Sequence, residues 1–413
     1  MAVAVTPEDI REASRIIHGQ VVRTPLIAAP KLSELCGADI WIKYENLQFT
    51  NSFKVRGALV KLLSLDAAAR RQGVIAVSAG NHAQAVAYHA ARLQIPATIV
   101  MPETTPFVKV ANTEALGATV VLSGATIAEA RSRVQKLAAE KSLTMVHPFD
   151  DPLIIAGQGT VGLELLEDQP DLDAIVIPVG GGGLIAGTAI AAKAIRPDVD
   201  IFGVEVDSYC SMYDAMAKRK GKYGGQTLAE GIAVKAAGTL TRPVVEKLVT
   251  EILLVPESAI ERAIYVLLTQ QKTMAEGAGA AGLAAVVENR ARFEGRKVCI
   301  VLTGGNIDGR ILASIMVRGL ERDNKIVSLR ITIADQPGVL GQIATTLGKS
   351  GANILEVSHR RLLLDVPAKG ATLDVLIETK DASHAEEVIS DMRKKGFDVH
   401  RLDAEGAGEI GTR

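Results

Sequence analysis

Short apolar runs rich in β-branched residues alternate with longer amphipathic stretches over roughly the first 322 residues. The clearest runs are VIAVS (74–78), ATIVMP (97–102), ATVVLS (118–123), DAIVIPVG (173–180), IFGVEV (201–206) and KVCIVLTGG (297–305). Apolar runs this continuous suit strands that are covered on both faces, and strand–helix alternation is typical of a doubly wound parallel sheet. We therefore expect an α/β region, in which the glycine-rich turns after several strands lie where open parallel sheets bind ligands.

The pattern changes near the charged segment LERDNKI (320–326), where we place a linker. Residues 326–403 then read as strand, helix, strand, strand, helix and strand, which is the βαββαβ order of a ferredoxin-like unit. At the other end of the chain, Thr6 followed by Pro7, Glu8 and Asp9 predicts a helix start. The sequence thus predicts a large α/β region followed by a small separate domain.

Composition narrows the class of protein. The chain has 413 residues, which is too long for one compact core, and a formal net charge of −1, which provides no overall field for nucleic acid or an anionic membrane. No apolar run reaches the roughly 18 residues of a spanning helix, and the N-terminus does not resemble a secretion signal, so we expect a cytoplasmic protein. Cys36, Cys210 and Cys299 lie far apart, which indicates neither a disulfide framework nor a zinc site.

Two segments in the first third of the chain carry candidate chemistry. NSFKVRGA (51–58) places Lys54 in a largely apolar neighbourhood, where desolvation would lower the pKa of the amine and favour Schiff-base chemistry. SAGNHAQA (78–85) joins a strand to a helix, and the amides of such a turn can hold an anion. A solvated surface lysine and a simple capped turn are the structural alternatives, and His82 suits a packing role as well as a catalytic one.

Two further strands run directly into glycines. PVGGGGLIAG (178–187) has four consecutive glycines before a helix, an arrangement that lets backbone amides approach a phosphate closely. It lacks the Lys-Ser or Lys-Thr of a P-loop and the downstream acid of a dinucleotide site, which disfavours nucleotide binding. VLTGGNID (301–308) places the hydroxyl of Thr303 at a strand end, where it can donate to a ring nitrogen.

Together these segments resemble the threonine/serine dehydratase branch of the fold-type II pyridoxal-phosphate enzymes, over about residues 5–320. The resemblance implies a two-lobed catalytic region over 1–322, with parallel sheets like those of tryptophan synthase beta and a small lobe over roughly 52–150. It implies that pyridoxal 5′-phosphate is bound covalently to Lys54, which also removes the α-proton, and that the loop Ser78, Ala79, Gly80, Asn81 and His82 binds the substrate carboxylate. The implied cofactor contacts are Phe53 beside the ring, Asn81 at its hydroxyl, Gly180, Gly181, Gly182, Gly183 and Leu184 at the phosphate, Thr303 at the ring nitrogen and Glu276 near the ring.

The implied activity is that of a threonine ammonia-lyase, which releases 2-oxobutanoate and ammonia from L-threonine and also acts on L-serine. Family members that racemise serine carry a second serine in this loop, where the present chain has Ala79, so a dehydratase is favoured over a racemase. A dehydratase of another hydroxy-amino acid, such as 3-hydroxyaspartate, and a non-catalytic amino-acid sensor stay open. Glu205 matches an acid by which some relatives hold a monovalent or divalent cation, although the residues after it do not repeat that site.

The C-terminal unit, residues 326–403, resembles an ACT domain, a module that binds amino acids at domain interfaces. The resemblance implies an effector site at Gly338, Val339, Leu340, Asn353 and Ile354. Because single ACT units usually pair between chains, it also implies a homo-oligomer, a dimer or a tetramer. Whether the effector activates or inhibits, and whether the enzyme serves isoleucine biosynthesis or threonine degradation, stays open, as does a purely structural role for this domain.

Overall fold

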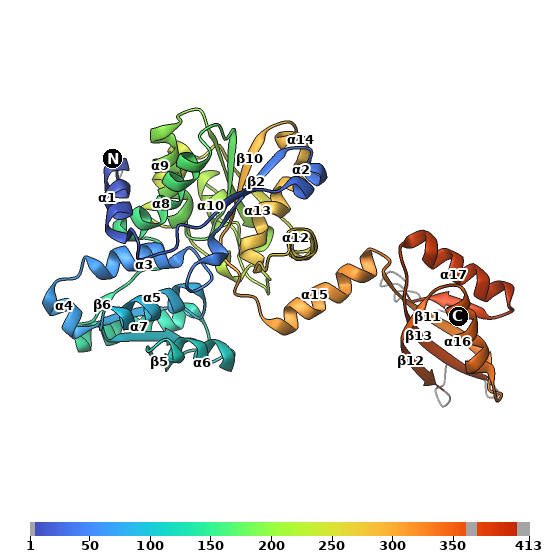
Figure 1. The fold of residues 1–413 in the computed structure, drawn as a ribbon. Helices are drawn as coiled ribbons and strands as arrows, with labels where there is room; N and C mark the ends of the chain where they lie inside the picture. Colours follow the sequence, from blue (N-terminus) through green and yellow to red (C-terminus); the bar gives the residue numbers. More distant parts are fainter. Residues whose placement is uncertain (1–4, 361–369, 403–413) are drawn as a thin grey trace. The chain divides into compact units, whose positions relative to one another are not determined.

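The computed structural model describes residues 5–360 and 370–402 (Figure 1). Its contacts divide the chain into two compact units, residues 1–308 and 309–413. The first unit holds a mainly parallel sheet in a large lobe and a parallel sheet in a small lobe, and the second unit holds an antiparallel sheet. In the described residues no helix is long and apolar enough to cross a membrane.

The large lobe is built on a six-stranded sheet whose strands are parallel, except that β1 runs antiparallel to β2. Its strands, in spatial order, are β1 (Leu26–Ala28), β2 (Asp39–Tyr44), β10 (Lys297–Leu302), β7 (Ala174–Pro178), β8 (Asp200–Val206) and β9 (Glu251–Val255). Its helices and short 3-10 turns are α1 (Pro7–Ile17), α2 (Pro30–Cys36), η1 (Glu45–Leu47), α8 (Pro152–Asp168), α9 (Gly183–Ile195), η2 (Asp207–Tyr209), α10 (Ser211–Met216), η3 (Glu230–Ile232), α11 (Thr241–Leu248), α12 (Glu257–Gln270), α13 (Gly277–Glu288) and α14 (Arg290–Phe293). Helix α1 begins as predicted, with a capping box between Thr6 and Asp9.

The small lobe is a four-stranded parallel sheet with the order β5 (Thr119–Leu122), β4 (Ala97–Met101), β3 (Val74–Val77) and β6 (Thr144–Met145). Its helices are α3 (Lys54–Leu63), α4 (Ala67–Gln72), α5 (Asn81–Arg92), α6 (Phe107–Ala115) and α7 (Ile127–Lys141). Helix α3 packs on both α5 and the large-lobe helix α8, so it lies where the two lobes meet (Figure 1). The expectation that every apolar run is covered on both faces is wrong for β5, because it is an edge strand whose residues are half-buried or exposed.

The second unit begins with α15 (Gly309–Arg322) and continues in the predicted βαββαβ order: β11 (Ile326–Ala334), α16 (Val339–Lys349), β12 (Asn353–Arg360), β13 (Gly370–Glu378), α17 (Ala382–Lys394) and β14 (Asp398–Arg401). The antiparallel sheet has the order β12-β13-β11-β14. Its core is formed by alternate residues of β11 and β13 packed under the two helices. Helix α15 contacts β11, so it groups with this unit, whereas the predicted catalytic region ran to residue 322.

Candidate active site

Lys54 is the first residue of α3, at the junction of the two lobes. Its Nζ donates to the carbonyl oxygen of Pro148 at 2.9 Å and lies 5.0 Å from the ring centroid of Phe53. Burial lowers the pKa of the amine to about 8, while the negative charge of Glu276 acts in the opposite direction. The alternative of a solvated surface lysine is therefore wrong, because the side chain is partly buried and its nearest hydrogen-bond partner is a neutral carbonyl.

The turn after β3 carries the predicted substrate loop into α5. The Gly80 amide donates to Ser78 Oγ at 3.2 Å, and no side chain caps the helix that begins at Asn81. His82 is buried, its Nε2 lies 2.9 Å from the carbonyl oxygen of Val146, and burial lowers its pKa to about 3. A neutral imidazole donating to a backbone carbonyl is a packing histidine, so the geometry favours the structural role for His82.

Asn81, Glu276 and Asn306 form a hydrogen-bonded cluster across three segments of the chain. Asn81 Nδ2 donates to Glu276 Oε1 at 2.6 Å, and Asn81 Oδ1 accepts from Asn306 Nδ2 at 2.7 Å. Burial raises the pKa of Glu276 to about 7, an effect that the hydrogen bond from Asn81 opposes. The sequence had pointed to Asn81 and Glu276 separately, while Asn306, inside the segment VLTGGNID (301–308), was missed.

The glycine loop joins β7 to α9, as predicted. Gly182 has a φ of 92° and stands before the first turn of α9 without offering a side-chain cap. A Cβ at Gly181 would lie 2.3 Å from the ring of Phe149, and the Gly181 carbonyl accepts from Thr241 Oγ1 at 2.7 Å. Glycine is thus required by the close approach of protein neighbours as well as by the turn, a requirement that the sequence could not reveal.

Thr303 is buried at the end of β10 and is tied to the segment that carries Lys54. Its carbonyl oxygen accepts from the Phe53 amide at 3.2 Å, and the next residue, Gly304, forms an isolated bridge with Ser52. The carboxyl end of a large-lobe strand and the start of α3 are therefore joined directly. This contact fixes the position of Lys54 relative to the large sheet.

The residues present suit pyridoxal phosphate. An amine with a lowered pKa suits a Schiff base to an aldehyde, and the uncapped first turn of α9 offers amide donors to a phosphate. Thr303 places a neutral hydroxyl donor at the carboxyl end of β10 rather than an acid. The amine, the backbone amides and the hydroxyl therefore match, in chemical type, the aldehyde, the phosphate and the ring nitrogen of that cofactor.

Behind Lys54, α3 is held by a buried ionic network that the sequence analysis missed. Arg56 donates from Nε and Nη2 to both oxygens of Glu45 at 2.8 Å, and from Nη1 to Glu164 Oε1 at 2.6 Å. Lys43 Nζ donates to Glu164 Oε2 at 2.6 Å. The side chains of Lys43 and Arg56 are fully buried. The signal that could have revealed the network was an arginine and a lysine within otherwise apolar segments.

Glu205, the candidate cation ligand, is fully buried rather than solvated at the strand end. Its two carboxylate oxygens accept from the amides of Met212 and Tyr213 at 2.9 and 2.8 Å. Burial raises its pKa to about 7. In the part of the chain that the structure describes, no cluster of three His, Cys, Asp or Glu residues is arranged to hold a metal ion, so the cation stays a prediction.

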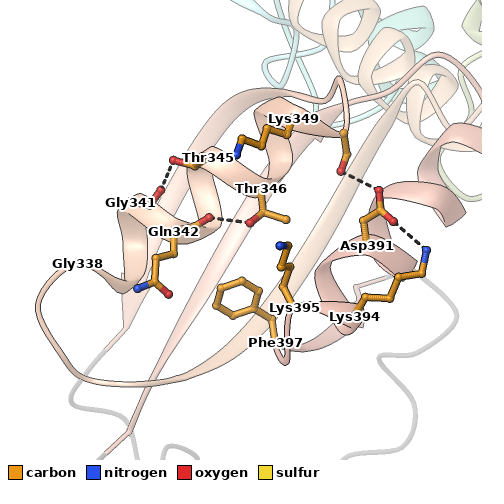
Figure 2. Close-up of a pocket in the computed structure, with 11 residues that line it drawn as sticks. Gly338, Gly341, Gln342, Thr345, Thr346, Lys349, Asp391, Lys394, Lys395 and Phe397 are labelled. Carbon is orange, nitrogen blue, oxygen red and sulfur yellow. Dashed lines mark hydrogen bonds and ion pairs between the residues drawn. The ribbon is translucent and has the colours of Figure 1, made fainter.

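In the second unit, a groove of about 810 Å³ lies between α16 and the end of α17 (Figure 2). Of the predicted effector residues it includes Gly338, whereas Val339, Leu340, Asn353 and Ile354 do not line it. Gly338 has a φ of 89° before α16, and Asn353 Nδ2 donates to Glu378 Oε2 at 3.2 Å. Figure 2 shows lysines around the groove, at the C-terminal ends of both helices, where they compensate the helix dipoles.

Comparison with known proteins adds independent information on both units. The family model described as pyridoxal-phosphate dependent enzyme matches residues 17–304, and the ACT domain model matches residues 327–396. The chain is 44% identical over 397 residues to the L-threonine ammonia-lyase of Thermotoga maritima, a match that covers 96% of this chain and 99% of that protein.

Solved structures resemble the first unit in fold. The T.th. threonine deaminase superposes with a TM-score of 0.70 at 41% identity, covering 73% of this chain and 99% of that one. Maize serine racemase superposes with a TM-score of 0.71 at 36% identity, covering 78% of this chain and 99% of that one. The fold is therefore shared by enzymes named for elimination and for racemisation, and fold alone does not separate the two reactions.

Proposed function

Because the chain belongs to the pyridoxal-phosphate dependent enzymes and carries an ACT domain, we propose that it is an L-threonine ammonia-lyase. It converts L-threonine to 2-oxobutanoate and ammonia by β-elimination and also accepts L-serine. The observation that carries the proposal is the partly buried amine of Lys54, held between the lobes with a lowered pKa and with Asn81 and Glu276 nearby.

The cofactor of this family is pyridoxal 5′-phosphate, which when bound supplies an electron sink for the carbanion that forms at Cα. In this chain Lys54 would hold the cofactor, Phe53 would flank the ring and Thr303 would donate to the ring nitrogen. The amides of Gly180, Gly181, Gly182, Gly183 and Leu184 would hold the phosphate, while Asn81 and Glu276 would serve the ring hydroxyl. A hydroxyl at the ring nitrogen would keep the electron sink weaker than an acid would, which favours rapid loss of a β-substituent.

Lys54 also transfers the proton. With a pKa of about 8, a far larger fraction of this amine is neutral near pH 7 than for an ordinary lysine, so it can act as the base that removes the α-proton of the substrate. The β-hydroxyl then leaves as water, and one water is consumed when the released imine hydrolyses. One L-threonine therefore yields one 2-oxobutanoate and one ammonia.

The turn of residues 78–82 supports elimination rather than racemisation. Its amides and the uncapped start of α5 suit the carboxylate of an amino acid. Ala79 packs against the core of the small lobe and carries no group that could donate or accept a proton. A racemase needs a second acid or base on the opposite face of the substrate, and this position does not supply one.

The ACT domain gives the enzyme allosteric control by an amino acid, with an effector site at Gly338, Val339, Leu340, Asn353 and Ile354 and with assembly into a homo-oligomer. The test is to measure the rate at subsaturating L-threonine with isoleucine, valine or other amino acids. We expect at least one of them to change the rate in the full chain, and the change to be lost in Asn353→Ala. A rate insensitive to all of them would leave the domain a structural role.

The function itself is tested by the visible spectrum of the purified protein and by 2-oxobutanoate release from L-threonine. We expect a cofactor absorption band and turnover in the wild type, and loss of both in Lys54→Ala, while Lys136→Ala, which changes an exposed lysine of α7, keeps both. A band without turnover on threonine or serine would indicate another substrate, such as 3-hydroxyaspartate. The absence of a band would refute the cofactor assignment.

A further inference from the structure

Asn306 lies at the centre of a chain of hydrogen bonds that crosses the candidate active site. Its Nδ2 donates to the carbonyl oxygen of Thr50 at 2.9 Å and to Asn81 Oδ1 at 2.7 Å. Asn81 Nδ2 in turn donates to Glu276 Oε1 at 2.6 Å. These hydrogen bonds link the segment before Lys54, the segment after β10, the start of α5 and the residue before α13.

This series of hydrogen bonds has a defined direction. The two ends of a carboxamide have nearly the same shape, so only their hydrogen-bond partners determine which end is nitrogen. The carbonyl of Thr50 can only accept, and it therefore orients the amide nitrogen of Asn306 toward itself. The second hydrogen of the same nitrogen reaches Asn81, so Asn81 presents its oxygen to Asn306 and its nitrogen to Glu276.

We propose that Asn306 is a positioning residue that sets the direction of the Asn81 carboxamide, so that Asn81 presents a donor and not an acceptor toward the cofactor hydroxyl. The inference rests on the proposed function, in which Asn81 contacts that hydroxyl. When that hydroxyl is ionised its oxygen can only accept, so an acceptor of Asn81 at this position would face its lone pairs and weaken cofactor binding. Asn306 acts here only through Asn81.

The space around this cluster supports the inference. A Cβ at Gly304 would lie 2.5 Å from Glu276 Oε1 and 3.1 Å from Asn81 Nδ2, so glycine at this position allows the two side chains to meet. The Glu276 amide donates to the Gly304 carbonyl at 3.1 Å, which holds the carboxylate beside the turn that carries Asn306. The alternative role for Asn306 is a simple brace of the segment before Lys54, where it donates to the Thr50 carbonyl and accepts from Asn51 Nδ2 at 3.3 Å, and this role would not depend on Asn81.

A double-mutant cycle separates these roles, because residues that act through one another give non-additive effects. The variants are Asn306→Ala, Asn81→Ala and the pair, each in the full chain, and the measurement is the dissociation constant of pyridoxal phosphate added to cofactor-free protein. We expect Asn306→Ala to weaken binding about tenfold, as befits one hydrogen bond to a charged group. In the Asn81→Ala background the same substitution should have less than about a twofold effect.

A second variant, Asn306→Asp, keeps the volume of the side chain but removes both donors, which guards against collapse of the turn in the alanine variant. We expect it to weaken cofactor binding and to shift the pH midpoint of the bound cofactor's visible absorption, and to lose most of both effects without Asn81. The melting temperature of each cofactor-free variant reports folding separately.

Equal effects of Asn306→Ala with and without Asn81 would overturn the inference in favour of a brace. So would wild-type affinity and spectrum in Asn306→Asp. A wild-type protein that binds the cofactor but does not turn over L-threonine would overturn the proposed substrate and leave the cycle interpretable. A wild-type protein that does not bind the cofactor would overturn both proposals.

Discussion

The pKa values of two cations on the first turn of α3 are shifted in opposite directions, although Lys54 and Arg56 lie only two residues apart. Lys54 donates to a neutral carbonyl and its pKa is lowered to about 8 by burial. Burial also lowers the pKa of Arg56, but the carboxylates of Glu45 and Glu164 outweigh it and hold that pKa above its ordinary value. The helix therefore carries one cation that can lose its proton and one that cannot.

The difference shows that hydrogen-bond and ion-pair partners, more than burial, determine whether a buried cation keeps its proton. A carboxylate bonded to the amine would keep Lys54 charged and unable to act as a base. Arg56, by contrast, would leave two carboxylates without their main partner if it were removed. Lys54 thus provides a reactive amine, whereas Arg56, two residues further on, holds the helix in place between the lobes.

The largest effect is expected when Lys54 is replaced by a residue that, like Arg56, stays charged near neutral pH. Lys54→Arg keeps the charge but cannot lose a proton near neutral pH, so 2-oxobutanoate release should fall at least about a thousandfold. Stability should change little, because the hydrogen-bond partner of Lys54 is a backbone carbonyl and no carboxylate among the described residues accepts a hydrogen bond from it. The assay is paired with a urea denaturation curve, and residual activity above about one tenth of wild type would contradict the role of Lys54.

Removing the second cation should affect folding rather than chemistry directly. Arg56→Met removes the arginine partner of the buried Glu45 and leaves Glu164 with Lys43 alone. We expect a loss of about 3–5 kcal/mol in the free energy of unfolding. The measurement is chemical denaturation of the full chain, with Arg71→Met, an exposed arginine of α4, as the matched control. A loss below about 1 kcal/mol would show that the network contributes little.

Glu276 is the charge that opposes the lowering of the Lys54 pKa by burial, and its own pKa is raised to about 7 from an ordinary 4.5. The folded state therefore binds this proton more tightly than the unfolded state, and the contribution of Glu276 to stability falls as pH rises from 4.5 to about 7. Glu276→Gln keeps an acceptor for Asn81 and removes this loss. Its stability relative to wild type should grow by about 1–3 kcal/mol across that window, and a constant difference would contradict the shift.

The smallest effect is expected at a half-buried cation that pairs with an exposed carboxylate across the two lobes. Lys109 of α6 pairs with Glu230 of η3, and the carboxylate is largely exposed. Water and salt screen such pairs, so Lys109→Met should change the free energy of unfolding by less than about 1 kcal/mol, and less still in high salt. A larger loss, measured by denaturation at two salt concentrations, would mean that this pair resembles the Arg56 network rather than a surface contact.

Much of the fold was predictable from local sequence. The apolar runs correctly predicted β3, β4, β7, β8 and β10, since a strand buried on both faces needs an uninterrupted apolar segment. The order of elements in residues 326–402 followed from the same pattern. The burial of β5 was predicted wrongly, because the sequence does not reveal which strand of a sheet lies at its edge.

The candidate site, like the fold, was predictable from the sequence only in part. The sequence by itself determined the chemical types present, an amine at the start of a helix and glycine turns after strands, because these depend on neighbours along the chain. Only the tertiary structure decided which groups meet: the carbonyl of Pro148 at Lys54, the two carboxylates at Arg56, and Asn306 beside Asn81. Except for Glu45, which is 11 residues from Arg56, those partners lie far away in sequence. A pKa or the direction of an amide depends on distances that only folding creates.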